Sequence, residues 1–398
     1  MYNNPYERHF EIDVEKFPVV VIESDDWGAC EVISDAGMLD KYNAVMKKYN
    51  KSQGGESSSL ERPDELEALY KVLEAHKGSD GNSAVFTAYT AMGNPDFDAI
   101  RKNNFTQYVD IPINKGFPAP WQGEGVVEKM REGMLRGVWH PEYHAMLHHT
   151  SPKLWMELLN GNSPASELAR ELFDLYSYYQ LQHLPEFNGY NIHEQYQMVN
   201  TGFQRFKETF GYMPNAAVTS DAFSETELVW LALGINTVPL KNCRVNTGEV
   251  VVYPTKPWNM QDVYAKIGDC SQIADACFLT RNVFLEVGNT FDEAIKTINK
   301  VFKIHKEPVV ISSHRANYCG FDRDVVKQRL ERLDMVLSTL DKMGVYYLTS
   351  AELSSIYRKG CSARKVGSKT LFRKWFDNAI TPDYAKDFPV GNHWLDIQ

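Results

Sequence analysis

Unbroken apolar runs alternate along the chain with segments whose apolar residues recur at helical spacing. The first run, residues 17–22 (FPVVVI), is rich in β-branched residues and contains no charged position. Such a run is typical of a strand that is buried on both faces, as in a parallel sheet. Further strand candidates cover residues 83–89, 137–143, 216–219, 236–238, 250–253, 278–279, 309–312 and 345–348. Helical patterns cover residues 63–76, 126–135, 152–159, 166–182, 194–210 and 322–343.

Strands that alternate with helices predict βαβ units and a parallel sheet. The chain shows no internal repeat of fixed period and no Pro/Gly-rich linker that would separate two domains. We therefore expect an α/β fold, a distorted (β/α) barrel of the TIM type with roughly seven or eight strands and helical insertions. The barrel should cover residues 17–355, preceded by an arm at 1–16 and followed by an extension at 356–398 that packs on it.

Composition and charge narrow the classes of function. Of 398 residues, 43% are hydrophobic and 24% are charged, an ordinary globular mixture that excludes a disordered chain. Acidic residues outnumber basic ones by 52 to 42, and the net charge of -10 disfavours binding to nucleic acid. No apolar stretch is long enough to span a bilayer, and the first residues lack the apolar segment of a secretory signal. Six scattered cysteines without a C-x-x-C pair suit free thiols, so we expect a cytoplasmic protein unless a leader has been trimmed from the chain.

Polar residues follow three of the predicted strands, at the ends where the active sites of barrels collect. The first cluster is Asp25-Asp26 in the segment ESDDWG, after the strand at 17–22. Two adjacent carboxylates after an apolar strand are costly unless a metal ion or a reaction uses them, the alternative being a cap or turn role. Neighbouring strand residues point to opposite faces, so the two carboxylates can share a site only if the chain turns sharply, which Gly28 would help.

The second cluster lies in residues 137–150, where His140, His144 and His148 stand at successive intervals of four. If residues 144–148 form a turn of helix, the last two imidazoles face one way, as a two-histidine metal site requires. His140 and His144 have the same spacing, but Pro141 lies between them and would spoil a helical turn. Surface or capping histidines are the alternative interpretation of this segment.

The third cluster is Ser312-Ser313-His314, at the end of the strand predicted for residues 309–312. Alone, its histidine is better interpreted as part of the core. Taken with the other clusters, one Asp and two His make a three-ligand set for a catalytic zinc-like ion that keeps an open position for water. A second Asp and a third His are then left to serve as base and acid.

These clusters resemble the motifs of the polysaccharide deacetylase superfamily, which are metal-dependent carbohydrate esterases on a distorted (β/α) barrel. The resemblance covers about residues 17–355 and lies in Asp25-Asp26-Trp27-Gly28, in the H-x-x-x-H of His144 and His148, and in Ser312-Ser313-His314. It implies that Asp25 is the general base and that His314 is the general acid. It also implies that Asp26, His144 and His148 are the metal ligands.

The chain departs from the family pattern in three respects, one of which is the unusually long gap between Asp26 and His144. The family has Gly directly after the Asp pair, whereas here Trp27 stands before Gly28. The family's arginine-containing motif is not visible, and residues 218–223 (VTSDAF) stand where it would be expected, so what orients Asp25 is left open. The candidate substrate-binding residues near the motifs are Trp27, His140, Glu142, Asp221 and Arg315.

The clusters and the resemblance together predict a hydrolase that removes acetyl groups from an N-acetylated or O-acetylated sugar or polysaccharide. One divalent metal ion is expected, Zn²⁺ first, with Co²⁺, Ni²⁺ or Fe²⁺ as alternatives for the same ligands. Carbohydrate is the expected partner, and the aromatic content of 12% suits either a sugar-binding cleft or a large core. Two rival functions are a carbohydrate-binding barrel that has lost catalysis and a metal-independent glycosidase that uses Asp25 with Glu23 or Glu142.

Overall fold

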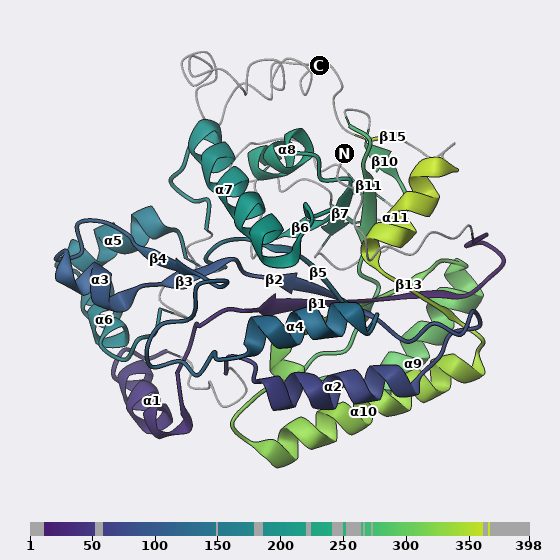
Figure 1. Cartoon of the computed structure of the whole chain (residues 1–398), viewed down its shortest axis with the longest axis horizontal. Helices are drawn as coiled ribbons and strands as arrows, with labels where there is room; N and C mark the ends of the chain where they lie inside the picture. Colours follow the sequence, from purple (N-terminus) through teal and green to yellow (C-terminus); the bar gives the residue numbers. More distant parts are fainter. Residues whose placement is uncertain are drawn as a thin grey trace.

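Figure 1 shows the chain as a computed structural model. The structure describes residues 12–51, 59–148, 150–178, 186–219, 224–240, 250–251, 264–265, 267–271, 274–360 and 365–366. Most of the predicted arm at 1–16 and of the predicted extension at 356–398 lies outside these ranges, so both remain predictions.

The centre of the fold is a parallel sheet built around β1 (Val19–Trp27). β1 pairs with β13 (Val309–His314) on one side and with β2 (Phe86–Thr90) on the other. The apolar first half of β1 has no exposed surface, as its unbroken apolar pattern predicts. The other strands of this sheet, each parallel to its neighbour, are β5 (Trp139–His144), β6 (Ala217–Val218), β12 (Val283–Phe284) and β14 (Tyr346–Leu348).

Parallel pairing continues beyond β6 as far as β11, and the ring of strands is interrupted between β11 and β12. An isolated parallel bridge between Ala216 and Thr237 joins the β6 side to β7 (Thr237–Leu240), and β7 pairs with β11 (Cys277–Thr280). β12 begins a few residues after β11 and pairs with β13. The predicted distorted (β/α) barrel is therefore confirmed. Its distortion lies at β6, which is very short, and at the break between β11 and β12.

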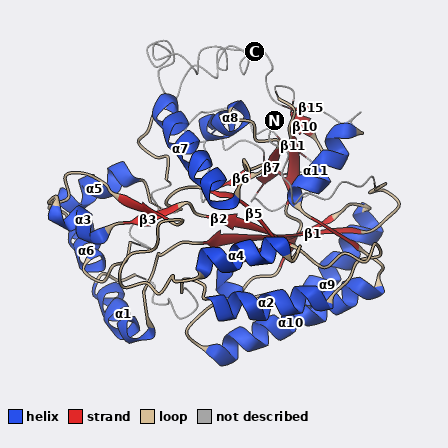
Figure 2. Cartoon of the chain, in the orientation of Figure 1, coloured by secondary structure: helices blue, strands red, loops and turns tan. Residues whose placement is uncertain are grey.

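Helices lie on two sides of the barrel strands, as Figure 2 shows. One set lies over the side of β1 that faces down in the figure and consists of α2 (Pro63–Ala75), α4 (Val126–Leu135), α9 (Phe291–Lys300) and α10 (Arg323–Lys342). The other set consists of α7 (Ile192–Phe210), α8 (Ser224–Ala232) and α11 (Ser350–Lys359). The helix predicted for residues 322–343 is confirmed as α10, which begins after Asp322 because that carboxylate accepts hydrogen bonds from Asp324 N and Val325 N.

An accessory layer stands beside the barrel at the left of Figure 1. It is built from insertions that follow β1, β2 and β5, so it lies at the carboxyl ends of these strands. Its elements are α1 (Leu39–Lys48), α3 (Phe97–Lys102), α5 (Pro152–Asn160), α6 (Pro164–Phe173) and the antiparallel strands β3 (Gly93–Pro95) and β4 (Asp110–Pro112). Trp155, Phe173 and Leu147 belong to its own apolar core, which is separate from the main one. α6 ends earlier than the pattern over 166–182 predicts, and left-handed backbone follows at Tyr176.

The remaining elements are small. They are β8 (Val250–Val251), β9 (Tyr264–Ala265), β10 (Cys270–Ser271), β15 (Lys365–Val366), two 3-10 segments at Ala36–Met38 and Arg315–Asn317, and a π-helical segment at Val301–His305. Within the described ranges, no helix is both long and apolar enough to cross a bilayer. The cysteines in these ranges, which are Cys30, Cys270, Cys277 and Cys319, are free thiols, as their spacing predicts.

Candidate metal centre

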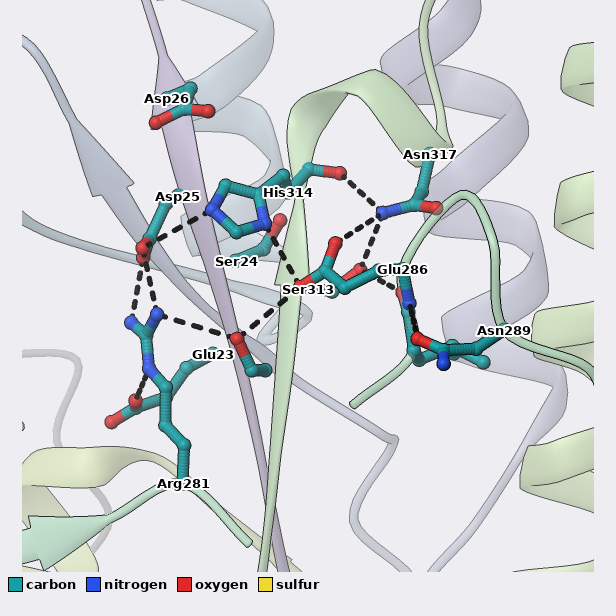
Figure 3. Close-up of polar contacts among 12 residues, drawn as sticks. Glu23, Ser24, Asp25, Asp26, Arg281, Glu286, Asn289, Ser313, His314 and Asn317 are labelled. Carbon is teal, nitrogen blue, oxygen red and sulfur yellow. Dashed lines mark hydrogen bonds and ion pairs between the residues drawn. The ribbon is translucent and has the colours of Figure 1, made fainter. Parts of the chain in front are cut away.

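The adjacent carboxylates Asp25 and Asp26 lie at the carboxyl end of β1, where the strand is irregular. The pairing of β1 with β2 shifts register between Ser24 and Trp27, and Asp26 adopts left-handed backbone with φ of 74°. Residues other than glycine seldom adopt this conformation, although Asp does so more readily than most. The bulge brings both carboxylates to one site, with Asp26 above Asp25 in Figure 3. The sharp turn that the sequence required is therefore present, but it occurs at Asp26 itself as well as at Gly28.

Asp26 meets two histidine side chains at this end of the barrel. Asp26 Oδ1 lies 3.1 Å from His144 Nε2 and 2.9 Å from His148 Nε2. One ligand atom from each residue lies within 4.8 Å of the others, which makes a candidate metal-binding group. One carboxylate oxygen and two imidazole nitrogens are the ligands of many catalytic Zn²⁺ sites, so this ligand set fits a divalent ion.

The two histidines come together without a helical turn at residues 144–148, which was the condition considered for their convergence. His144 is the last residue of β5, and the chain then folds back through left-handed backbone at Ala145 (φ 56°) and His148 (φ 37°). The expected helix start after the cluster is nevertheless present, because α5 begins at Pro152 with Ser151 as its N-cap. A tight turn, which a spacing of four also permits, therefore replaces the helix.

Charge interactions dominate the protonation of this group. Burial alone would raise the pKa of Asp26, but the charges of His148 and His314 hold the pKa well below its usual value. Burial also opposes protonation of His148, yet the carboxylates of Asp26 and Glu31 outweigh it and raise the pKa of His148 to about 10. The negative charge collected here attracts a cation, whether a proton or a metal ion.

Asp25 is oriented by Arg281, a residue that the sequence pattern did not single out. Arg281 Nη1 and Nη2 each donate to one oxygen of Asp25 at 2.7 Å, and Nε donates to Glu23 at 2.6 Å (Figure 3). Arg281 is 2% exposed and Asp25 is 0% exposed, so the bidentate pair is shielded from solvent. This arginine follows β11 and does not come from residues 218–223, of which 220–223 lie outside the described residues. The rule that led to the other clusters, a polar residue directly after an apolar strand, could have found Arg281.

His314 lies on the opposite side of Asp25 from Arg281. It pairs with Asp25 in the register of β1 and β13, and its Nε2 is 3.8 Å from Asp25 Oδ2. Its Nδ1 lies 2.9 Å from Glu286 Oε1, and Glu286 also accepts hydrogen bonds from Ser312 Oγ and Asn317 Nδ2. Burial would lower the pKa of His314, but the neighbouring carboxylates raise it to about 9. His314 is therefore an imidazolium at neutral pH, and its side chain is 38% exposed at the site.

Two of the predicted substrate-binding residues are buried. Trp27 has no exposed surface, packs edge-to-face on Trp139 with ring centroids 4.6 Å apart, and donates its Nε1 to Ser24 Oγ. Arg315 is 2% exposed and donates to the carbonyl oxygen of Ala29. Both side chains are buried in this structure, Trp27 in the core and Arg315 against the backbone of Ala29, so their substrate contacts stay predictions.

Glu142 and His140, two further candidates, have almost no exposed surface. Glu142 is fully buried and accepts hydrogen bonds from the backbone N–H groups of Asn215 and Ala216. His140 is 3% exposed, and its Nε2 lies 3.2 Å from Glu142 Oε1. Both side chains are therefore engaged within the fold at β5, and a substrate contact for either one stays a prediction. Asp221 lies outside the described residues.

Comparison with known proteins places the chain among distant structural neighbours. Neither the search of protein-family models nor that of curated proteins returned a match. A putative polysaccharide deacetylase from Mycobacterium smegmatis is similar, with a TM-score of 0.43, 10% identity, and coverage of 89% of this chain and 96% of that one. The peptidoglycan deacetylase PdaC from Bacillus subtilis is similar with a TM-score of 0.34, 10% identity, and coverage of 91% and 98%.

A 4-alpha-glucanotransferase from Thermococcus litoralis is also similar, with a TM-score of 0.42, 9% identity, and coverage of 84% of this chain and 40% of that one. Similarities at this level do not assign an activity. The arrangement of side chains in this chain is the basis for the functional argument.

Proposed function

We propose that the chain is a metal-dependent deacetylase that hydrolyses acetyl groups on a carbohydrate, with an N-acetylated or O-acetylated sugar as substrate. The observation that carries this proposal is the convergence of Asp26, His144 and His148 beside a carboxylate and an imidazolium. Asp25 and His314 come from paired positions on neighbouring strands, so a candidate base and a candidate acid meet next to the candidate metal ligands. Hydrolysis of an acetyl group by this mechanism needs a metal ion, a base and an acid in one place.

The ion-binding residues would be Asp26, His144 and His148. A bound divalent ion would polarise the acetyl carbonyl and lower the pKa of a water molecule, which is the chemistry that such ions supply. Zn²⁺ fits one carboxylate and two imidazoles best, and Co²⁺, Ni²⁺ or Fe²⁺ suit the same ligands.

The remaining side chains move protons. Asp25 accepts the proton of the attacking water, and Arg281 holds this carboxylate in one orientation through two hydrogen bonds. His314 Nε2, on the other side, donates a proton to the departing amine or alcohol. Glu286 accepts the Nδ1–H of His314, so it keeps the ring in one orientation and favours its protonated form.

The hydrogen bonds of the other carboxylates disfavour the rival functions. A metal-independent glycosidase would need Glu23 or Glu142 to act on a substrate, but Glu142 accepts hydrogen bonds from the backbone N–H groups of Asn215 and Ala216. Glu23 is engaged by Arg281 and also accepts from Ser350 Oγ at 2.6 Å. A barrel that had lost catalysis was favoured by the missing orienting arginine, and Arg281 removes that reason. Cytoplasmic location and carbohydrate as the partner complete the proposal.

The decisive experiment measures metal content and products together. The purified chain is stripped with a chelator, reloaded with Zn²⁺ or Co²⁺, and supplied with acetylated chitooligosaccharides and with an O-acetylated oligosaccharide. We expect about one ion per chain and release of acetate without new reducing ends. Release of reducing ends by the metal-free chain would overturn the proposal in favour of a glycosidase.

Three variants separate the roles of the residues. His148→Ala should lose the ion and the activity together. Asp25→Asn should keep the ion and lose roughly 10²–10⁴-fold in turnover, the usual contribution of a positioned base. His140→Ala is the matched control, because it removes a histidine that lies outside the metal centre, and it should keep the ion. Near-normal turnover of metal-loaded Asp25→Asn would show that Asp25 is not the base.

A further inference from the structure

A second carboxylate lies behind the candidate metal centre, on the side of His148 that faces away from Asp26. Glu31 follows β1, is 3% exposed, and its Oε1 is in hydrogen-bond contact with His148 Nδ1. The other ring nitrogen, Nε2, lies 2.9 Å from Asp26 Oδ1. The imidazole is therefore held between two carboxylates, one belonging to the candidate metal centre and one behind it.

His148 lies in a turn with left-handed backbone, and its ring is positioned by packing and not by a helix. The side chain is 3% exposed, and its ring packs edge-to-face on that of His144 with centroids 4.4 Å apart. Packing does not decide which ring nitrogen carries the proton. A hydrogen-bond partner at Nδ1 does decide it, and so leaves the lone pair of Nε2 directed at Asp26.

Glu31 is itself fixed by a buried network. Tyr178 N and Ser177 Oγ both donate to the carbonyl oxygen of Glu31 at 3.2 Å, which ties its backbone to the accessory layer. Its second carboxylate oxygen, Oε2, lies 3.7 Å from Arg315 Nη2. Arg315 also reaches Glu61, whose Oε1 accepts from the N–H of Gly28 at 2.8 Å. The network thus runs from the turn after Asp26, through Arg315 and Glu31, to His148.

We propose that Glu31 is a positioning residue for the metal centre, holding the Nδ1–H of His148 so that Nε2 presents its lone pair to the ion. A histidine that binds metal through one nitrogen commonly donates the other N–H to a carboxylate, which sets the tautomer and makes the ligand more basic. Glu31 is the described residue that meets this requirement for His148. Arg315, for which we expected substrate contact, acts in this network by holding Glu31. The inference rests on the proposed function, because it needs an ion at Asp26, His144 and His148.

The test is the affinity of the full chain for Zn²⁺, measured by competition with a chromophoric chelator. Glu31→Gln keeps an oxygen that can accept the Nδ1–H but removes the negative charge, and we expect roughly 10-fold weaker binding. Glu31→Ala removes the contact and should approach about 100-fold weaker binding. The absorption bands of the Co²⁺-loaded chain should also change in Glu31→Ala, because the ring can then rotate. At saturating Zn²⁺ the turnover of Glu31→Gln should return close to that of the unmodified chain.

Glu65→Gln is the matched control. Glu65 is another buried carboxylate, but it is bonded to Arg62 and to the N–H of Gly320, and the metal affinity should not change when it is replaced. Thermal unfolding of the metal-free variants checks folding, and Glu31→Gln carries the test if Glu31→Ala does not fold. Unchanged affinity in both Glu31 variants, or an equal loss in Glu65→Gln, would overturn the inference. Failure of the unmodified chain to bind any divalent ion would instead overturn the proposed function.

Discussion

Replacing Arg281 with methionine would leave two buried carboxylates, Asp25 and Glu23, without the guanidinium that neutralises them. Both carboxylates are 0% exposed, and the arginine donates three hydrogen bonds to them at 2.6 Å, 2.7 Å and 2.7 Å. Methionine occupies a similar volume, so the change removes charge and donors with little loss of packing. We expect a large loss of stability together with a loss of activity, because the same contacts orient Asp25.

The loss in the free energy of unfolding can be worked out from these contacts. Hydrogen bonds to charged groups contribute about 1.5–3 kcal/mol each, but burying the guanidinium itself costs much of that energy. Removing one partner of a buried ion pair costs about 3–5 kcal/mol. Glu23 keeps hydrogen bonds from Ser350 Oγ at 2.6 Å and from Tyr89 Oη at 3.2 Å, so its share of the penalty is reduced. The free energy of unfolding should therefore fall by about 3–4 kcal/mol, in the lower part of that range.

The assay is urea unfolding of the chelator-treated chain at neutral pH, followed by tryptophan fluorescence. Arg358→Met is the control, because the partner of Arg358, Asp275, is 79% exposed, and its loss should cost no more than about 1 kcal/mol. The double variant Asp25→Asn/Arg281→Met should be more stable than Arg281→Met, since it removes one of the orphaned charges. A loss below about 1 kcal/mol for Arg281→Met, or the absence of coupling to Asp25, would refute this reasoning.

Three further predictions concern the candidate acid His314, the buried carboxyl group of Glu186, and Gly202 in helix α7. Glu286 helps to raise the pKa of His314 to about 9, so Glu286→Gln should lower that pKa. A general acid works only at a pH below its pKa. The alkaline limb of kcat/KM should then move to lower pH, and an unmoved limb would contradict the role of Glu286. Burial raises the pKa of Glu186 from 4.5 to about 7, so this residue stabilises the fold below pH 4.5 and the contribution is lost as pH rises through 7. Against Glu186→Gln, the unmodified chain should therefore lose up to about 3 kcal/mol between pH 4.5 and pH 8 in urea unfolding, and parallel pH curves would contradict this. Gly202→Ala would place a Cβ 2.5 Å from Tyr143 Oη, so it should cost about 1–3 kcal/mol despite a better helix former. An increase in the midpoint of urea unfolding for this variant would show that Tyr143 can move aside.

Local pattern was sufficient to predict most of the elements. β1 and β13 are continuous apolar runs, and α10 has both an amphipathic pattern and an N-cap at Asp322, all of which depend on residues close together in the chain. The sequence also placed Asp25, Asp26 and His314 at one end of the barrel. Parallel strands bring their carboxyl ends to the same edge, so a polar residue after each strand converges with the others whatever the loops do.

The details of the site depended on contacts that no local pattern encodes. Arg281 and Asp25 are 256 residues apart, and only the order and register of the strands put the guanidinium beside that carboxylate. Left-handed backbone at Asp26 and His148 shapes the site, and at His148 it takes the place of the helical turn considered for residues 144–148.

Long-range packing also changed which side chains near the motifs face the metal centre. Trp27 follows the Asp pair directly, yet the bulge turns it into the core, where Trp139 receives it. Glu31 looks like an ordinary loop carboxylate in the sequence, and it gains its contact with His148 only because the accessory layer folds its backbone against that turn. Which side chains face the candidate metal centre was therefore decided by long-range packing, since a shift of one residue along a strand reverses the direction of every side chain.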